Sequence, residues 1–170
     1  MKIFYVHHAL RAMGNPPSQD DDITPLGENE AKVISQILEP LSKRLKIKAI
    51  YTSPYFRCKK TSKIINEVLN VPIYEEPRFN EFENVFALVQ GKDFCKEKET
   101  WLDCQLRIRE AIKDIVNKYS CDETVICVTS GVNISAFISL AYKIKPDNNL
   151  PLPLVPGCSP ICFDIDESCF

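Results

Sequence analysis

The chain lacks the long apolar runs and the surplus of positive charge that mark membrane-inserted and nucleic-acid-binding proteins. Nowhere among its 170 residues do eighteen apolar residues follow one another, and no basic segment with a longer apolar run after it stands near the first residue. The formal net charge is -2, whereas a nucleic-acid surface needs a basic stripe to neutralise phosphates. We therefore expect a cytoplasmic protein with no membrane segment and no nucleic-acid partner, whose ligands are small molecules or proteins.

A recognisable metal-ligand pattern is also missing. The eight cysteines are scattered through predicted helices and strands of a chain that is large enough to build a core without disulfides, so we expect most of them to be reduced. Cys158, Cys162 and Cys169 form the one cluster, but no histidine follows them at the spacing of a zinc site. The sequence predicts neither a metal site nor a cofactor.

The composition and the apolar pattern indicate one globular domain that covers residues 1–170. Hydrophobic residues make up 45% of the chain and charged residues 26%, without an internal repeat. Short apolar runs, typical of strands, alternate with stretches of helical periodicity, which is the pattern of α/β folds. The predicted strands are residues 2–6, 48–52, 71–74, 124–129 and 161–165, and the predicted helices are 24–41, 53–70, 92–118 and 130–142. We expect a three-layer α/β/α sandwich with a mostly parallel, mixed sheet.

Proline and hydroxyl side chains predict where two of the helices begin. Thr24 and Ser53 each precede a proline, so a hydroxyl is expected to cap the free amides while proline occupies the first helical position. Pro40 should kink or interrupt the first helix near its end. Residues 77–82 are expected to form an extended segment.

Two histidines follow the first apolar run and are the first candidates for chemistry. His7 and His8 come where the predicted strand 2–6 ends, and ligands of open α/β sheets bind at the carboxyl ends of the strands. By themselves the two residues also fit a simpler interpretation, in which a histidine only bonds a backbone carbonyl at the strand end.

Two arginines are candidates for binding an anion. Arg57 falls on the first turn of the predicted helix 53–70, where free amides already favour negative charge and a guanidinium adds two charge-assisted hydrogen bonds. The alternative is a surface arginine paired with a carboxylate. Arg11 lies in the predicted loop 10–23 after the histidines, together with Asn15, and the alternative for it is a solvated loop side chain.

Three further motifs together with the opening strand resemble the histidine phosphatase superfamily, the phosphoglycerate-mutase-like enzymes. They are residues 24–31 (TPLGENEA), 53–61 (SPYFRCKKT) and 128–132 (VTSGV). In that family a strand ends in Arg-His-Gly and the histidine takes the phosphoryl group. The resemblance implies that His8 is the nucleophile and that Arg57 belongs to a phosphate clamp. It also implies a phosphorylated small molecule or phosphate as ligand.

A leucine-any-glutamate signature of the family is matched by Phe79-Asn80-Glu81. The resemblance implies that Glu81 is the general acid for the leaving alkoxide. Glu83 is a second candidate for that role, and an exposed loop carboxylate is the alternative for both. Arg107 is expected to be structural. If His8 is the nucleophile, the rate should fall as the pH drops through the histidine range.

The sequence departs from the family at three positions. His7 stands where the family has arginine, Ala9 where it has glycine, and Ser130 where it has a second histidine. Loss of one preorganised donor typically costs about a hundred- to a thousandfold in rate. His7, if protonated, and Arg11 are candidate substitutes for the lost charge, and a side chain at position 9 is expected to crowd the phosphate. Ser130 is either an uncharged phosphate donor or an ordinary helix cap.

Two hypotheses follow from this incomplete set of residues. The first is a phosphomonoester hydrolase that acts through a phosphohistidine at His8, with weak activity or an unusual substrate preference. The second is a catalytically inactive relative, a pseudoenzyme that binds a phosphorylated ligand or a protein partner.

Overall fold

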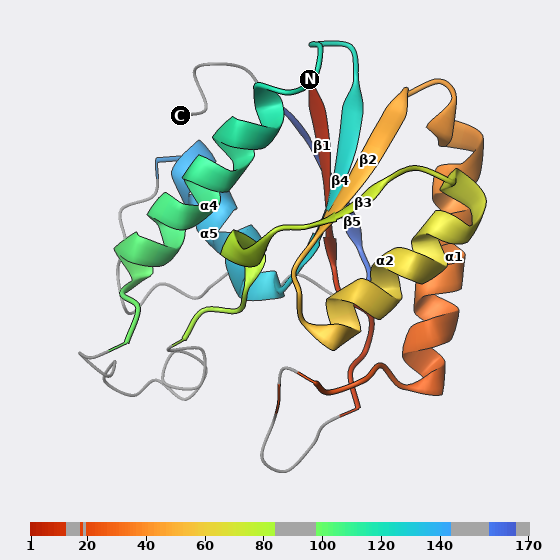
Figure 1. Ribbon diagram of the computed structural model, residues 1–170, viewed down its shortest axis with the longest axis horizontal. Helices are drawn as coiled ribbons and strands as arrows, with labels where there is room; N and C mark the ends of the chain where they lie inside the picture. Colours follow the sequence, from red (N-terminus) through yellow and green to blue (C-terminus); the bar gives the residue numbers. More distant parts are fainter. Residues whose placement is uncertain (13–17, 19, 84–97, 144–156, 166–170) are drawn as a thin grey trace.

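A mixed five-stranded sheet forms the centre of the molecule (Figure 1). The computed structural model describes residues 1–12, 18, 20–83, 98–143 and 157–165. The strand order is β3-β2-β4-β1-β5; β1, β2, β3 and β4 run parallel, whereas β5 is antiparallel to β1. The strands are β1 (Lys2–His7), β2 (Ile47–Thr52), β3 (Ile73–Glu75), β4 (Thr124–Thr129) and β5 (Pro160–Asp164). The prediction of a mostly parallel, mixed sheet is confirmed.

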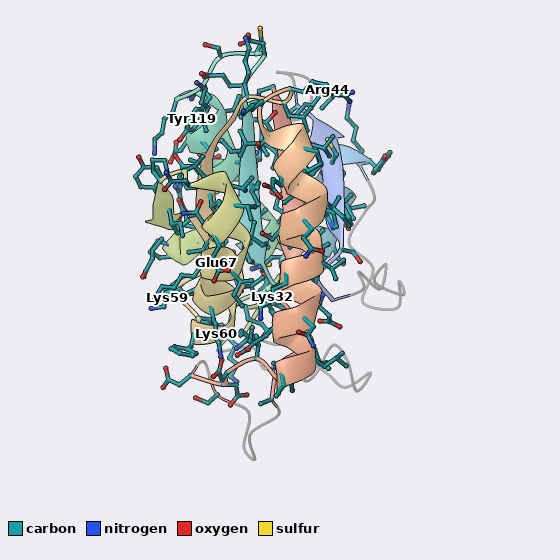
Figure 2. All side chains as sticks on the ribbon, turned by 90° about the vertical axis from the view of Figure 1, so that its right-hand side faces the viewer. Lys32, Arg44, Lys59, Lys60, Glu67 and Tyr119 are labelled. Atoms are coloured by element: carbon teal, nitrogen blue, oxygen red, sulfur yellow. The ribbon has the colours of Figure 1, made fainter. Side chains whose placement is uncertain are left out.

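Helices cover both faces of this sheet, as the α/β/α prediction required. One side carries α1 and α2 and the other carries α4 and α5 (Figure 1). The helices are α1 (Pro25–Ser42), α2 (Phe56–Leu69), α4 (Trp101–Val116) and α5 (Gly131–Ala141), with a short 3-10 turn η1 (Pro77–Phe79). Side chains that alternate along β1 enter two different hydrophobic clusters, because Tyr5 packs on the α4–α5 side and Val6 on the α1–α2 side. The outer helix faces carry charged side chains such as Lys32 and Glu67 (Figure 2).

The start of α1 is tied to the chain segment that follows the two histidines. The hydroxyl of Thr24 accepts a hydrogen bond from Gly27 N at 3.0 Å, and Pro25 occupies the first turn, so the predicted cap is confirmed. The amide of Thr24 donates to Leu10 O at 2.8 Å. A Cβ atom at Gly27 would lie 2.5 Å from Leu10 O, so only glycine allows this approach.

Three local predictions were wrong, and for Pro40 the structure excludes the interruption but does not test the kink. Ser53 does not cap α2, because its amide still bonds Val128 O as part of the sheet edge; Tyr55 precedes the helix, without a side-chain cap. The helix α1 passes through Pro40 and ends at Ser42. Residues 77–79 form a 3-10 turn in place of an extended segment, since Glu76 caps it by accepting from Arg78 N. The helix expected from residue 92 begins at Trp101, where Thr100 and Asp103 form a capping box; residues 84–97 lie outside the described part.

The described residues bear on two of the expected absences. None of the described helices is long and apolar enough to span a membrane. The six described cysteines are free, and within the described ranges no group of three histidine, cysteine or acidic residues is placed to hold a metal ion. Cys169, a member of the cysteine cluster, lies outside the described residues.

Candidate active site

Three parallel strands end at one edge of the sheet and deliver polar residues there. His7 at the end of β1 is in register with Thr129 at the end of β4, and the next amide, His8 N, donates to Thr129 O at 2.9 Å. Ser130 follows directly and is the cap residue before α5. The amide of Ser53, after β2, donates to Val128 O at 3.0 Å. The structure therefore places His7, His8 and Ser130 together at the carboxyl edge of β1 and β4.

His8 is held in one tautomer. Its Nδ1 lies 2.8 Å from Ala9 O, and because a carbonyl oxygen can only accept, Nδ1 carries the proton. The other ring nitrogen, Nε2, therefore keeps its lone pair. The residue is 7% exposed. Burial, followed by the charges of His7, Arg57 and Arg11, lowers the pKa of His8 to about 3, against the bond to Ala9 O, which raises it. His8 is thus a neutral imidazole at physiological pH.

This low pKa changes the expected dependence of activity on pH. A histidine of ordinary pKa would lose its lone pair between about pH 7 and 6. For His8 that loss shifts to near pH 3. The expectation that the rate falls through the usual histidine range is therefore replaced. Protonation of His8 should cause no decrease in kcat/KM between about pH 7 and 6.

The neutral His8 is also expected to make the fold sensitive to acid. Below pH 6.5 the unfolded chain binds a proton at this imidazole that the folded chain binds only near pH 3, so the free energy of unfolding decreases as the pH falls between these values. At about pH 4.5 this effect amounts to about 2–3 kcal/mol. Urea unfolding at pH 7 and 4.5 should show this additional loss in the natural protein but not in His8→Gln. An equal loss in both would contradict the assignment.

Arg57 is a buried cation whose hydrogen bonds are incomplete. It lies on the first turn of α2, as predicted, and is 1% exposed. Its Nη1 donates to Ser18 O at 3.3 Å, and its guanidinium carbon lies 4.7 Å from the centre of the Tyr55 ring. Within the described part of the chain, Arg57 Nε has no acceptor. A buried donor without a partner is costly, so an anion bound here would stabilise the arginine.

Glu81 is the carboxylate that the structure brings to this arginine. Its Oε2 accepts from Arg57 Nη2 at 2.6 Å, and its side chain is 19% exposed. Glu83, the other candidate, faces the residue before the α4 cap instead, where its Oε2 accepts from Glu99 N at 3.0 Å. Phe82, between the two glutamates, is buried with its ring 5.6 Å from that of Trp101. The geometry favours Glu81 over Glu83 as a group of the site.

His7 lies over the amino end of α5. A Cβ atom built on Gly131 would lie 3.2 Å from His7 Cε1, and the ring centres of His7 and His8 are 4.5 Å apart. Ser130 Oγ caps α5 by accepting a hydrogen bond from Asn133 N at 3.5 Å. Ser130 is therefore a helix cap, one of the two interpretations that the sequence left open. The imidazole of residue 7 therefore lies beside the helix start that Ser130 caps.

Two other predicted contributions are less direct. Arg11 is half-buried and pairs with Ile23 through an isolated backbone bridge, while its charge helps to lower the pKa of His8. Ala9 is fully buried within the hydrophobic cluster on the α1–α2 side. Its methyl group is thus part of the core, and the expectation that it crowds the phosphate is not supported. Asn15 lies outside the described residues.

Sequence reasoning missed three supporting residues. Thr61 accepts from Ala9 N at 3.1 Å and donates to Arg57 O at 2.7 Å, which joins the turn after His8 to α2. Thr129 and Asn133 both donate to Phe79 O at 2.8 Å. The signal for Asn133 was the one amide side chain, in the first turn, of a helix that is otherwise built of apolar residues, glycine and serine, because a buried amide needs hydrogen-bond partners.

The site therefore combines a neutral imidazole nitrogen, a buried guanidinium and a carboxylate. A neutral imidazole can attack phosphorus, a guanidinium can bind phosphate oxygens and a carboxyl group can transfer a proton. These groups come from the end of β1, the first turn of α2 and the segment after η1.

Solved structures share the fold of this chain. It is similar to Bacillus stearothermophilus YhfR, with a TM-score of 0.78 and 22% identity over 98% of this chain and 92% of that one. It is similar to a variant of phosphoserine phosphatase from Entamoeba histolytica solved with phosphoserine, with a TM-score of 0.75 and 15% identity over 98% and 91% of the two chains. A third is the mycobacterial glucosyl-3-phosphoglycerate phosphatase solved with VO3, at 0.70 and 15% over 95% and 90%.

Sequence comparison identifies the family. No curated protein sequence matches the chain. The family model described as histidine phosphatase superfamily (branch 1) matches residues 15–170, which is most of the chain. The chain therefore belongs to the histidine phosphatase superfamily.

Proposed function

We propose that this protein is a phosphomonoester hydrolase that acts through a phosphohistidine at His8. The observation that carries the proposal is the fixed, neutral imidazole of His8, whose Nδ1 donates to Ala9 O and whose Nε2 keeps its lone pair. The family supports it, and three structural relatives were solved with phosphoserine, vanadate or tungstate. The ligand class of the proposal is accordingly a small phosphorylated molecule.

The proposed reaction has two steps. Nε2 of His8 attacks phosphorus, so that a P–N bond forms and the P–O bond to the alcohol breaks, while Glu81 gives its proton to the leaving oxygen. Water then attacks the phosphohistidine, and the Glu81 carboxylate takes a proton from it. The P–N bond breaks, inorganic phosphate leaves and Nε2 regains its lone pair.

The ion pair between Arg57 and Glu81 sets a condition on the first step. A carboxylate that is ionised and paired with a guanidinium has no proton to donate. Phosphate oxygens must therefore replace Glu81 on Arg57, and Glu81 must take up a proton from water or from the monoanion of the substrate, before it acts as an acid. The Glu81 carboxylate lies 2.6 Å from Arg57 Nη2, the group proposed to bind phosphate, so substrate and Glu81 compete for Arg57.

The same pair favours a second candidate function, an inactive relative that binds a phosphorylated ligand or a protein. The clamp consists of Arg57, the imidazole of His7, the helix cap at Ser130 and the charge of Arg11, without the second arginine and second histidine that the family pattern implies. If Glu81 only neutralises Arg57, the site binds anions without turning them over. The two functions differ in one measurable respect, because the hydrolase forms a phosphohistidine at His8 and the inactive relative does not.

Anion binding tests the site itself. Removing the charge of Glu81 in Glu81→Gln should tighten phosphate binding at least about tenfold, because the competing carboxylate is gone from Arg57. Titration calorimetry at fixed ionic strength measures this. Glu83→Gln is the matched control, since it makes the same charge change at a carboxylate that bonds Glu99 N, and its affinity for phosphate should not change.

Crystals soaked in vanadate provide the structural side of the test. The anion should be ordered between His8, Arg57 and the amino end of α5. An empty edge with vanadate ordered elsewhere, or phosphate binding that weakens in Glu81→Gln, would contradict the proposed site.

A further inference from the structure

The backbone that leads to Glu81 is held by side chains from α4, from the end of β4 and from α5. Residues 78–80 belong to no strand, and the amides of Phe79 and Asn80 donate only within the turn η1. The backbone carbonyls of residues 78–80, however, all accept hydrogen bonds from side chains. Arg107 on α4 donates to Arg78 O, and Thr129 at the end of β4 donates to Phe79 O.

Asn133 makes the largest number of these contacts. Its Nδ2 lies 2.8 Å from Phe79 O, 2.8 Å from Asn80 O and 2.8 Å from Thr129 Oγ1. Its Oδ1 accepts from Arg107 Nη2 at 3.4 Å and from Cys104 Sγ at 3.6 Å. The residue is fully buried on the first turn of α5, so each polar atom of its amide is used where water is excluded.

We propose that Asn133 is a positioning residue that holds Glu81 beside Arg57, by fixing the carbonyls of Phe79 and Asn80 to the start of α5. Asn80 is the residue directly before Glu81, so a shift of this segment moves the carboxylate. The part of the proposal that concerns catalysis rests on the proposed function of Glu81 as the acid. The part that concerns position does not.

Only an amide suits this place. Two carbonyl acceptors and one hydroxyl acceptor surround Nδ2, while N–H and S–H donors face Oδ1. An aliphatic side chain would leave the Asn80 carbonyl without its side-chain donor, and a carboxylate would turn a second acceptor toward two carbonyls. The salt bridge of Arg107 with Glu99 fixes the donor on the other side.

Amide hydrogen exchange tests the position without any need for activity. In Asn133→Ala, amides of residues 79–82 should exchange at least about tenfold faster than in the natural protein, because their segment loses its attachment. Ser139→Ala is the matched control, since it removes another buried polar group from α5 and should leave this segment unchanged. If Asn133→Ala does not fold, Thr129→Val removes one donor to Phe79 O and should show a smaller increase in the same amides.

Leaving-group dependence tests the link to catalysis. An alkyl phosphate needs a proton on its leaving oxygen, whereas p-nitrophenyl phosphate releases a stable phenolate and needs little help. Asn133→Ala should therefore lower kcat for the alkyl ester at least about tenfold more than for the aryl ester, with the same selectivity as Glu81→Gln. A purely structural loss would lower both equally.

The outcomes are distinguishable. Unchanged exchange in folded Asn133→Ala overturns the positioning role. Faster exchange with equal losses for both esters overturns the link to the acid. If the natural protein forms no phosphohistidine at all, the proposed function fails, while the exchange result still decides whether Asn133 holds the segment.

Discussion

Replacing His8 with alanine is expected to abolish phosphate ester hydrolysis, with a loss of at least about a thousandfold in kcat. The reason is that the proposed attack on phosphorus uses the lone pair on Nε2 of His8, a neutral imidazole whose other nitrogen donates to Ala9 O. Turnover of p-nitrophenyl phosphate by purified variants measures the effect. His7→Ala is the comparison, because it removes the neighbouring imidazole and leaves the nucleophile.

Trapping the intermediate makes this expectation sharper than rates alone. After incubation with a phosphate ester that carries a labelled phosphoryl group, the label should stay attached to the natural protein and to His7→Ala, but not to His8→Ala. The attachment should be labile in acid and stable in base, as expected of a phosphohistidine. Hydrolysis that persists in His8→Ala would show a contaminant or another chemistry. Absence of the adduct in every protein, together with tight phosphate binding, would favour the inactive relative.

Restoring the family's two missing donors should produce the largest gain. We expect His7→Arg combined with Ser130→His to raise kcat/KM for phosphate esters at least about a hundredfold, the size of one recovered donor. Ser130→His is expected to work only together with His7→Arg. The imidazole of His7 now lies against Gly131, and a new ring at position 130 would meet it there.

The structure also decides which position to leave alone. Ala9 is buried in the hydrophobic cluster on the α1–α2 side, so a glycine there would remove core contacts without opening the phosphate site. Single variants and calorimetric phosphate binding are the controls. A folded double variant that binds phosphate but gains no rate would place the defect in Glu81 or its surroundings and replace the enzyme proposal by the binding one.

Local patterns in the sequence were sufficient for the sheet and for one side of the site. Short apolar runs predicted the strands because a buried parallel strand needs little beyond continuous hydrophobicity. Arg57 could be placed on the first turn of a helix from its distance to the preceding strand. The end of β1 was identified because two imidazoles stop an apolar run.

The remaining features depend on contacts between distant segments. Arg57 and Glu81, which form an ion pair, are 24 positions apart in the sequence. Asn133 and Phe79, which are joined by a hydrogen bond, are 54 positions apart. The pKa of His8 is set by burial, which a residue type does not reveal. Ser53 failed as a predicted cap because its amide extends the sheet, a role that the Ser-Pro pattern does not exclude.

The chain's single tryptophan has a useful location. Trp101 is the first residue of α4, and the centre of its ring lies 5.6 Å from the centre of the Phe82 ring, with an angle of 79° between the ring planes. Phe82 is the residue directly after Glu81. If phosphate displaces Glu81 from Arg57, the environment of this indole should change with it. The natural protein would then carry its own optical reporter, and stopped-flow fluorescence could time the departure of the carboxylate without an attached dye.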